Sequence, residues 1–243
     1  PANAVCVTFD DGYLNNLTVA QPILAKYKIP ATVYIATGFS QGTNMWNDRV
    51  MHLFADKDRQ QISLQGKLIK LADWPQRRQL AQQWLMKLKY LPVGPRLAEV
   101  EQFYQENNVS EQTSLMMTPL QIKQLADTGV TIGAHTINHP ILKVLPVAEQ
   151  QTEIVQSKQQ LEQWVGQPVN HFAYPNGVFD RDFDDTAVNI VQQVGFSTAV
   201  ATDWGVSGMA SSPHKLRRFT PWDRTALKFH ARLIANMRQS QPL

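Results

Sequence analysis

The chain is poor in cysteine, in charge and in long apolar runs, and each shortage excludes a class of protein. Its 243 residues contain one cysteine, Cys6, so an intramolecular disulfide is excluded, and we expect Cys6 to be a small buried side chain of the first strand. No apolar run approaches the roughly 20 residues of a membrane span. Charged residues make up 18% of the chain. The net charge of +3 is small and the Lys and Arg residues are scattered along the sequence, which gives no support to a nucleic-acid partner.

The residues that are present fit one sizeable globular unit. Hydrophobic residues make up 43% of the chain, and 243 residues suffice for one large α/β domain or two small ones. Because the chain begins with Pro1 rather than Met, we expect further residues upstream, where a signal peptide or anchor would lie. We therefore favour the cell envelope, the periplasm or the exterior as its location and leave the cytoplasm open. The sequence predicts no particular oligomeric state.

Short apolar runs and amphipathic stretches alternate along most of the chain. β-branched apolar runs favour buried strands, and apolar residues at helical spacing favour helices. The predicted strands span residues 4–9, 31–36, 130–134, 169–174, 196–201 and 215–219. The predicted helices span residues 17–27, 118–128, 146–165, 182–194 and 223–237. This order predicts an α/β fold of six or seven units, with parallel strands and right-handed crossovers.

The alternation is interrupted between residues 38 and 118. This stretch predicts a loop at 38–46, a short helix at 48–55, a small hairpin at 61–70 and helices at 75–91 and 95–107. We interpret it as a mostly helical insertion in a single domain of residues 1–243, because no Gly/Ser/Pro linker brackets it. We also expect it to contain too few apolar residues for a separate hydrophobic core. Helical insertions of this kind commonly cover one end of a barrel.

Polar side chains follow several predicted strands at the point where each strand ends. They are Asp10, Asp11, His135, Tyr174 and Asp203. In a β/α barrel the carboxyl ends of the strands meet at one face, and active sites are built there. The agreement among separate strands predicts a site at this face.

Two pairs of residues in this set indicate metal chemistry. Asp10 and Asp11 are adjacent and precede Gly12; taken alone they fit an ordinary turn. His135 and His139 leave one strand four positions apart, and two histidines with one carboxylate are typical of a catalytic metal site with open positions. A divalent metal lowers the pKa of a water in an open position toward about 7. One carboxylate of the pair would then bind the metal, and the other would act as general base.

Three motifs resemble the polysaccharide deacetylases, the NodB-homology group or carbohydrate esterase family four. They are residues 8–12 (Thr-Phe-Asp-Asp-Gly), residues 135–140 (His-Thr-Ile-Asn-His-Pro) and, in its Phe-x-x-Pro-x-Gly frame, residues 172–177. The resemblance implies an irregular (β/α) barrel of about seven strands. It also implies a hydrolase that removes acetyl groups from N-acetylated, and sometimes O-acetylated, sugars of an oligo- or polysaccharide.

The resemblance also assigns roles to individual residues. Asp10 matches the general base. Asp11, His135 and His139 match the ligands of a divalent metal, usually Zn²⁺. Tyr174 matches the residue whose backbone N–H holds the oxyanion of the tetrahedral intermediate.

Two supporting residues of the family are not where its motifs have them. The third motif lacks the arginine that orients the base, and we expect Arg218 to replace it in preference to Arg217; ordinary surface arginines are the alternative. The Leu-x-His motif that supplies the general acid is also absent. His214 is the nearest substitute, and it fits better than His171 or His230.

Four further residues are candidates for contact with the sugar: Trp46, Pro175, Asp203 and Trp204. Trp46 could stack on a sugar ring or, alternatively, anchor the insertion onto the barrel. Asp203-Trp204 resembles part of the family's fourth motif, where Asp203 would orient an acid or an arginine. Two other functions stay open: a metal-dependent amidohydrolase acting on a non-carbohydrate C–N bond, and an inactive sugar-binding relative.

Overall fold

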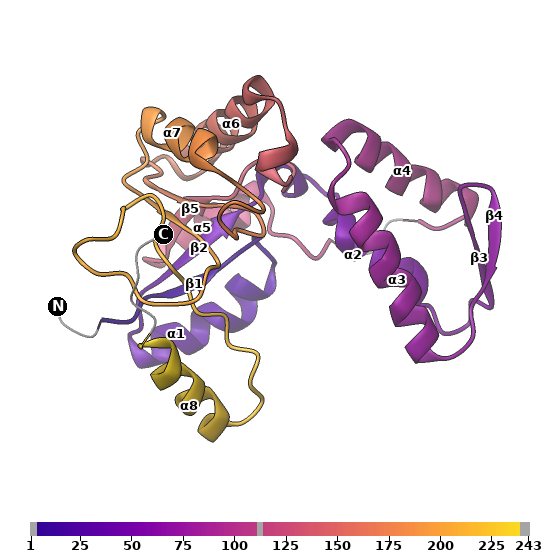
Figure 1. Cartoon of the computed structure of the whole chain (residues 1–243), viewed down its shortest axis with the longest axis horizontal. Coiled ribbons are helices and arrows are strands. Elements are labelled where there is room, and N and C mark those ends of the chain that lie inside the picture. Colours follow the sequence, from indigo (N-terminus) through magenta and orange to yellow (C-terminus); the bar gives the residue numbers. More distant parts are fainter. Residues whose placement is uncertain (1–3, 111–113, 239–243) are drawn as a thin grey trace.

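A curled sheet of five parallel strands forms the centre of the larger part of the molecule (Figure 1). The computed structural model describes residues 4–110 and 114–238. The strands lie in the order β1-β2-β5-β6-β7, and every neighbouring pair is parallel. Their bounds are β1 (Val7–Phe9), β2 (Ala31–Ile35), β5 (Thr131–Ala134), β6 (His171–Ala173) and β7 (Thr198–Val200).

Helices cover the outer face of this sheet and enclose its main hydrophobic core. Val33, Ile132 and Phe172 point outward from three strands and pack in one buried cluster with Leu125 and Leu161 of the helices. The helices that contribute buried side chains to this cluster are α5 (Pro119–Asp127), α6 (Val147–Val165) and α7 (Asp185–Gln193). Two further helices, α1 (Gln21–Tyr27), which follows a π-helical turn at Asn16–Ala20, and α8 (Ala226–Asn236), do not contribute to it, and 3₁₀ turns span Thr37–Phe39 and Leu142–Val144.

The inner face of the curled sheet is filled by a few side chains. Tyr34 packs there with Ala173, Val200 and Leu216. A Cβ atom on Gly133 would lie 2.4 Å from the ring of Tyr34, so only glycine lets β5 approach this ring. The inner face is therefore a packed interior rather than a pore, as in other β/α barrels.

The closing edge of the barrel is less regular than expected. The sheet of the described residues has five strands instead of about seven, and the predicted strand at 215–219 is reduced to one parallel bridge between Val200 and Leu216. β1 is consequently an edge strand that pairs only with β2. Our expectation for Cys6 was wrong: it precedes β1 at this open edge and is exposed.

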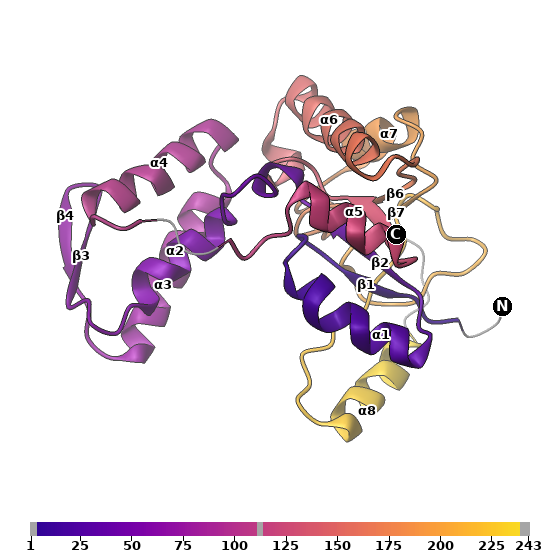
Figure 2. The same cartoon turned by 180° about the vertical axis from the view of Figure 1, so that it is seen from behind.

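The insertion forms a lobe beside the sheet, as both views show (Figures 1 and 2). It contains α2 (Trp46–Ala55), the antiparallel hairpin of β3 (Gln61–Leu64) and β4 (Lys67–Lys70), α3 (Trp74–Lys89) and α4 (Val93–Glu106). Its buried side chains form a second cluster, which includes Leu53, Ile62, Leu88, Val100 and Phe103. The expectation that this stretch is too poor in apolar residues for a core was wrong, because apolar side chains from α2, the hairpin, α3 and α4 converge in this cluster, while others, such as Leu68 and Met86, stay exposed.

Two further expectations concern single segments. A helix start at 118 was predicted, and Thr118 and Gln121 form a capping box at the start of α5, which confirms that helix boundary. No helix in the described part of the chain is long and apolar enough to cross a membrane.

Candidate metal centre and active site

The chain turns sharply after β1, and this turn brings two adjacent carboxylates to one place. Neighbouring residues of a strand point to opposite faces, so a regular strand would separate them. Asp11 and Gly12 both have positive φ, of 73° and 92°, and the N–H of Gly12 donates to the carbonyl of Asp10. A Cβ on Gly12 would lie 3.0 Å from Ile35, so the turn requires glycine on two counts.

Asp11, His135 and His139 bring three potential ligand atoms together, all within 4.8 Å of one another. Asp11 Oδ1 lies 3.6 Å from Nε2 of His135 and 3.4 Å from Nε2 of His139. Within the described part of the chain, this buried Oδ1 has no hydrogen-bond partner. A buried carboxylate oxygen without a donor, facing two imidazole nitrogens, fits a divalent cation bound between them.

The protonation of the two histidines suits this use. Nδ1 of His135 lies 2.7 Å from the carbonyl oxygen of Ala173. A carbonyl only accepts, so Nδ1 carries the hydrogen and Nε2 presents its lone pair to the site. Burial lowers the pKa of His135, and burial with the nearby Arg96 lowers the pKa of His139 to about 4. Both rings are therefore neutral at pH 7 and able to bind a metal.

The charge on the two carboxyl groups differs. Burial raises the pKa of Asp11 to about 6 against the pull of His135, and repulsion from Asp10 and Asp48 adds to the rise. A cation beside Asp11 would offset both the burial and the repulsion. Burial also raises the pKa of Asp10, but attraction to Arg218 and to the two histidines, together with the hydrogen bonds from Arg218, outweighs the burial, and the net shift is downward.

Arg218 holds Asp10 from across the open edge of the barrel. Its Nη1 and Nη2 donate to the two carboxylate oxygens of Asp10 at 2.7 Å and 2.8 Å, which is the fork-to-fork geometry of a strong ion pair. Its Nε donates to the carbonyl of Ala201, beyond the end of β7. Arg217, the other candidate, donates instead to the carbonyl of Trp204. The contact expected of Arg218 is thus present, and its catalytic role stays a prediction.

The resemblance implied that the backbone N–H of Tyr174 binds the oxyanion, but this N–H already has a partner. The N–H of Tyr174 donates to the carbonyl of Val200, and its hydroxyl donates to the carbonyl of His214. Its ring is fully buried and stacks on Phe183 at 3.7 Å between centroids. The assignment of the oxyanion donor to Tyr174 therefore needs correction, because the strand pairing already uses this N–H. The N–H of Asn176, two residues further on, has no such partner among the described residues.

His214 lies at the wrong end of the barrel for a general acid. Its Nε2 is 2.8 Å from the carbonyl oxygen of Phe196, which precedes β7, whereas Asp10 follows the end of β1. His171 pairs with Thr198 at the same far end. This expectation fails because residues 213–218 run parallel to β7, so that His214 lies near the start of that strand, whereas Arg218, four residues later, reaches Asp10.

The residues expected to contact sugar have structural partners. Trp46 is buried, and its ring lies 4.8 Å from the guanidinium carbon of Arg96. This favours the alternative that Trp46 anchors the insertion. Asp203 accepts from the N–H of Phe179, and Trp204 packs edge-on against Phe219. Pro175 is buried directly after β6. Sugar contact by Pro175 and Trp204 stays a prediction.

A polar group from the insertion reaches the same region. Tyr13, just after the turn, donates its hydroxyl to Asp48 of α2 at 2.8 Å. Tyr13 follows Asp11 by two residues, so this bond places the first turn of α2 near the candidate metal ligands, and the charge of Asp48 adds to the burial that raises the pKa of Asp11. The sequence signal was the Trp-Asn-Asp run at 46–48.

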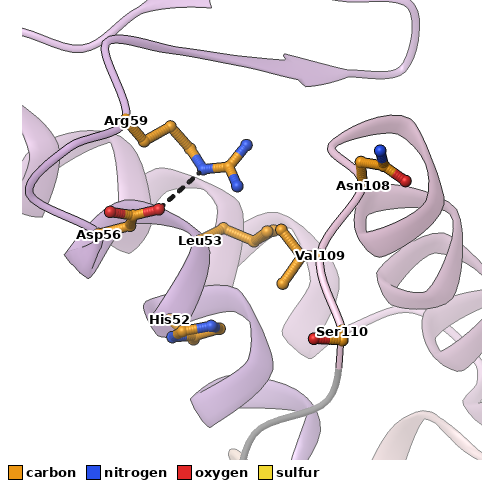
Figure 3. A pocket seen from close by; sticks show the side chains of 7 residues that line it. All are labelled: His52, Leu53, Asp56, Arg59, Asn108, Val109 and Ser110. Atoms are coloured by element: carbon orange, nitrogen blue, oxygen red, sulfur yellow. Dashed lines mark ion pairs between the residues drawn. The ribbon is translucent and has the colours of Figure 1, made fainter.

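The cavity drawn in Figure 3 belongs to the lobe and not to this site. It has a volume of about 350 Å³, and an Asp56–Arg59 ion pair lies on its wall. None of the residues predicted for the site lines it.

The sequence matches the family described as polysaccharide deacetylase over residues 1–70 and 98–199. Residues 71–97, which belong to the lobe, and residues 200–243 lie outside the match. The putative polysaccharide deacetylase YxkH of Bacillus subtilis (strain 168) is 20% identical over 214 residues, which cover 88% of this chain and 50% of that protein. The chain thus spans half the length of this curated relative.

Solved structures share the fold. The Streptococcus pyogenes deacetylase PplD, solved in complex with acetate, aligns with a TM-score of 0.59 and 22% identity over 98% of this chain and 72% of that chain. IcaB from Ammonifex degensii aligns with a TM-score of 0.59 and 19% identity over 97% of this chain and 74% of that chain. The predicted β/α fold class is confirmed.

Proposed function

Because the chain belongs to the polysaccharide deacetylase family, we propose that it hydrolyses the acetyl amide of an N-acetylated sugar within an oligo- or polysaccharide. Acetyl esters of sugars are a second substrate of the same chemistry. One observation carries the proposal: Asp10, held by Arg218, lies beside the convergent group of Asp11, His135 and His139.

The metal of this proposal is a divalent cation, most simply Zn²⁺. Two imidazole nitrogens and one carboxylate oxygen form a donor set that suits zinc and leaves room for further ligands. When bound, such an ion polarises the acetyl carbonyl and lowers the pKa of water toward about 7. Asp11, His135 and His139 would hold it.

Asp10 is the general base in this proposal, and Arg218 is its positioning residue. The ion pair keeps Asp10 ionised, and the contact of Arg218 with Ala201 fixes the direction in which the carboxylate points. Asp10 accepts a proton as the water oxygen bonds to the acetyl carbon. The same carboxylic acid can then return the proton to the sugar nitrogen as the C–N bond breaks, which yields acetate and a free amine.

The developing oxyanion requires a hydrogen-bond donor, and the backbone of Asn176 is the proposed one. Asn176 lies in the turn after β6 with φ of 60°, and its N–H pairs with no carbonyl among the described residues. The following residue, Gly177, donates to the carbonyl of Pro175 and so fixes the turn.

The experiment that tests this function incubates the chain with Zn²⁺ and oligomers of N-acetylglucosamine and measures released acetate and new primary amine. We expect equal amounts of both products. Acetylated xylan in a parallel reaction tests ester cleavage, where acetate appears without amine. A chain that binds Zn²⁺ but releases acetate from neither substrate would refute the proposal and favour an inactive sugar-binding relative.

A further inference from the structure

In the sequence, Asn138 lies between His135 and His139 of the candidate metal site. Hydrogen bonds hold the peptide units on both sides of it. Glu153 of α6 accepts from the N–H of Asn138 at 2.9 Å and from its side-chain amide at 2.7 Å. The same carboxylate accepts from the N–H of Ile137 at 2.8 Å. These bonds fix the loop from the side of the barrel.

Arg96 holds the same loop from the side of the lobe. It belongs to the first turns of α4, its side chain is completely buried, and its Nη2 donates to the carbonyl of Asn138 at 2.6 Å. The ring of Trp46 covers its guanidinium, and Glu153 attracts it electrostatically. Burial lowers the pKa of Arg96 only to about 10, so the side chain is charged at pH 7.

The bond from Arg96 acts directly on the backbone of His139. A peptide unit is planar, so the carbonyl oxygen of Asn138 and the N–H of His139 turn together. Arg96 holds the oxygen, and Oγ1 of Thr136 accepts from the N–H at 3.1 Å. His139 itself has φ of 51°, a left-handed conformation that a non-glycine residue keeps only when its surroundings impose it.

We propose that Arg96 is a positioning residue of the metal centre and that the lobe, through it, sets the affinity of the site for metal. The inference rests on the proposed binding of a divalent ion by Asp11, His135 and His139. Removal of Arg96 leaves the 138–139 peptide held at its N–H end alone, by Thr136, so that the peptide can tilt and displace Nε2 of His139 relative to the other two ligand atoms. Residues that orient metal ligands typically contribute about 10- to 100-fold in metal affinity.

A second buried arginine of the lobe provides a matched control. Arg77 of α3 donates to the carbonyls of Ala72, Asp56 and Arg59, all inside the lobe. Loss of Arg77 weakens the lobe without touching the loop at 135–139. The pair therefore separates an effect of lobe stability from an effect of the contact with Asn138.

The experiment measures the Zn²⁺ dissociation constant of the whole chain by competition with a chromophoric chelator. We expect R96M to raise it by about 10- to 100-fold, R96K to lie between R96M and the wild type, and R77M to stay within about twofold of the wild type. With Co²⁺ as probe, we expect the visible absorption bands of R96M, but not of R77M, to differ from those of the wild type.

The outcomes distinguish this inference from the proposed function. Wild-type protein that binds neither Zn²⁺ nor Co²⁺ would refute the metal site itself. A metal-binding wild type with an unchanged R96M, or with R77M weakened equally, would overturn only the role of Arg96. If R96M does not fold, the comparison of R96K with R77K decides the question in the same way.

Discussion

The sheet and the lobe are both packed around buried side chains, but they are held together differently. The core of the sheet joins apolar strand residues such as Val33 and Phe172 to apolar helix residues such as Leu161. Arg77 and Arg96 of the lobe are buried and donate to backbone carbonyls, and the buried Arg49 pairs with Glu101. The carbonyls bound by Arg77 lie at the end of α2 and on either side of the β3–β4 hairpin, so one guanidinium joins these segments. Arg96 instead joins the lobe to the loop after β5 through Asn138.

The sheet and the lobe also contribute different residues to the site. The strands and the turns after them position all four residues that carry the proposed chemistry. The lobe contributes no proposed ligand or base; it reaches the site through Arg96 on the metal-binding loop and through Asp48 on Tyr13. We infer that the sheet positions the residues of the proposed reaction and that the lobe orients them through these contacts.

The largest effect is expected from a change in the sheet-borne machinery. D10N removes the base and should lower kcat by about 10³-fold, within the range of general-base catalysis, while Zn²⁺ stays bound. Steady-state kinetics and metal analysis on the same sample measure both quantities. The control is D127N, which changes an exposed aspartate of α5 paired with Lys123. Near wild-type turnover by D10N would contradict the base assignment, and loss of Zn²⁺ would exchange the roles of Asp10 and Asp11.

The next effect concerns the support of that base. R218M should lower kcat/KM by about 10²-fold, because the carboxylate loses its orientation and the charge that stabilises it. Arg218 lowers the pKa of Asp10, so its removal raises that pKa. The base works ionised, and the acidic limb of the pH profile should therefore move to higher pH. R217M, whose side chain contacts Trp204 instead, should keep the wild-type profile. An unmoved limb in R218M would separate Arg218 from the ionisation of Asp10.

A change inside the lobe should destabilise the lobe and leave the stability of the sheet unchanged. R77M leaves three carbonyls without their donor and should destabilise the lobe by about 3 kcal/mol. Hydrogen exchange should quicken in α3 and in the β3–β4 hairpin and stay unchanged in β2 and β5. Equal quickening in all of these elements would mean that the lobe and the sheet unfold together.

The smallest effect tests the packing of the barrel interior. G133A introduces a methyl group 2.4 Å from the ring of Tyr34 and should destabilise the fold by about 2 kcal/mol. G94A, in α4 of the lobe, meets nothing within 4 Å and should be neutral or slightly stabilising. Denaturant unfolding of both variants measures the difference, and a destabilisation no larger in G133A than in G94A would show that the interior is loosely packed.

The sequence alone determined the order of strands and helices and the places where acids and histidines leave the strands. Both follow from local patterns: the period of apolar residues distinguishes strand from helix, and residues that follow parallel strands gather at one end of the sheet. Asp10, Asp11, His135 and His139 therefore came together as expected. The core of the lobe was missed because the convergence of helices is not visible in the composition of each.

Only the tertiary structure decided which side chains support these four. Arg218 meets Asp10 across 208 positions of sequence, and Arg96 meets Asn138 across 42. The role predicted for Tyr174 was wrong because strand pairing already uses its N–H. The role predicted for His214 was wrong because its imidazole is held near the start of β7, at the opposite end from the site. Such partners depend on how the sheet curls and where the lobe docks, and these are properties of long-range packing that no local pattern records.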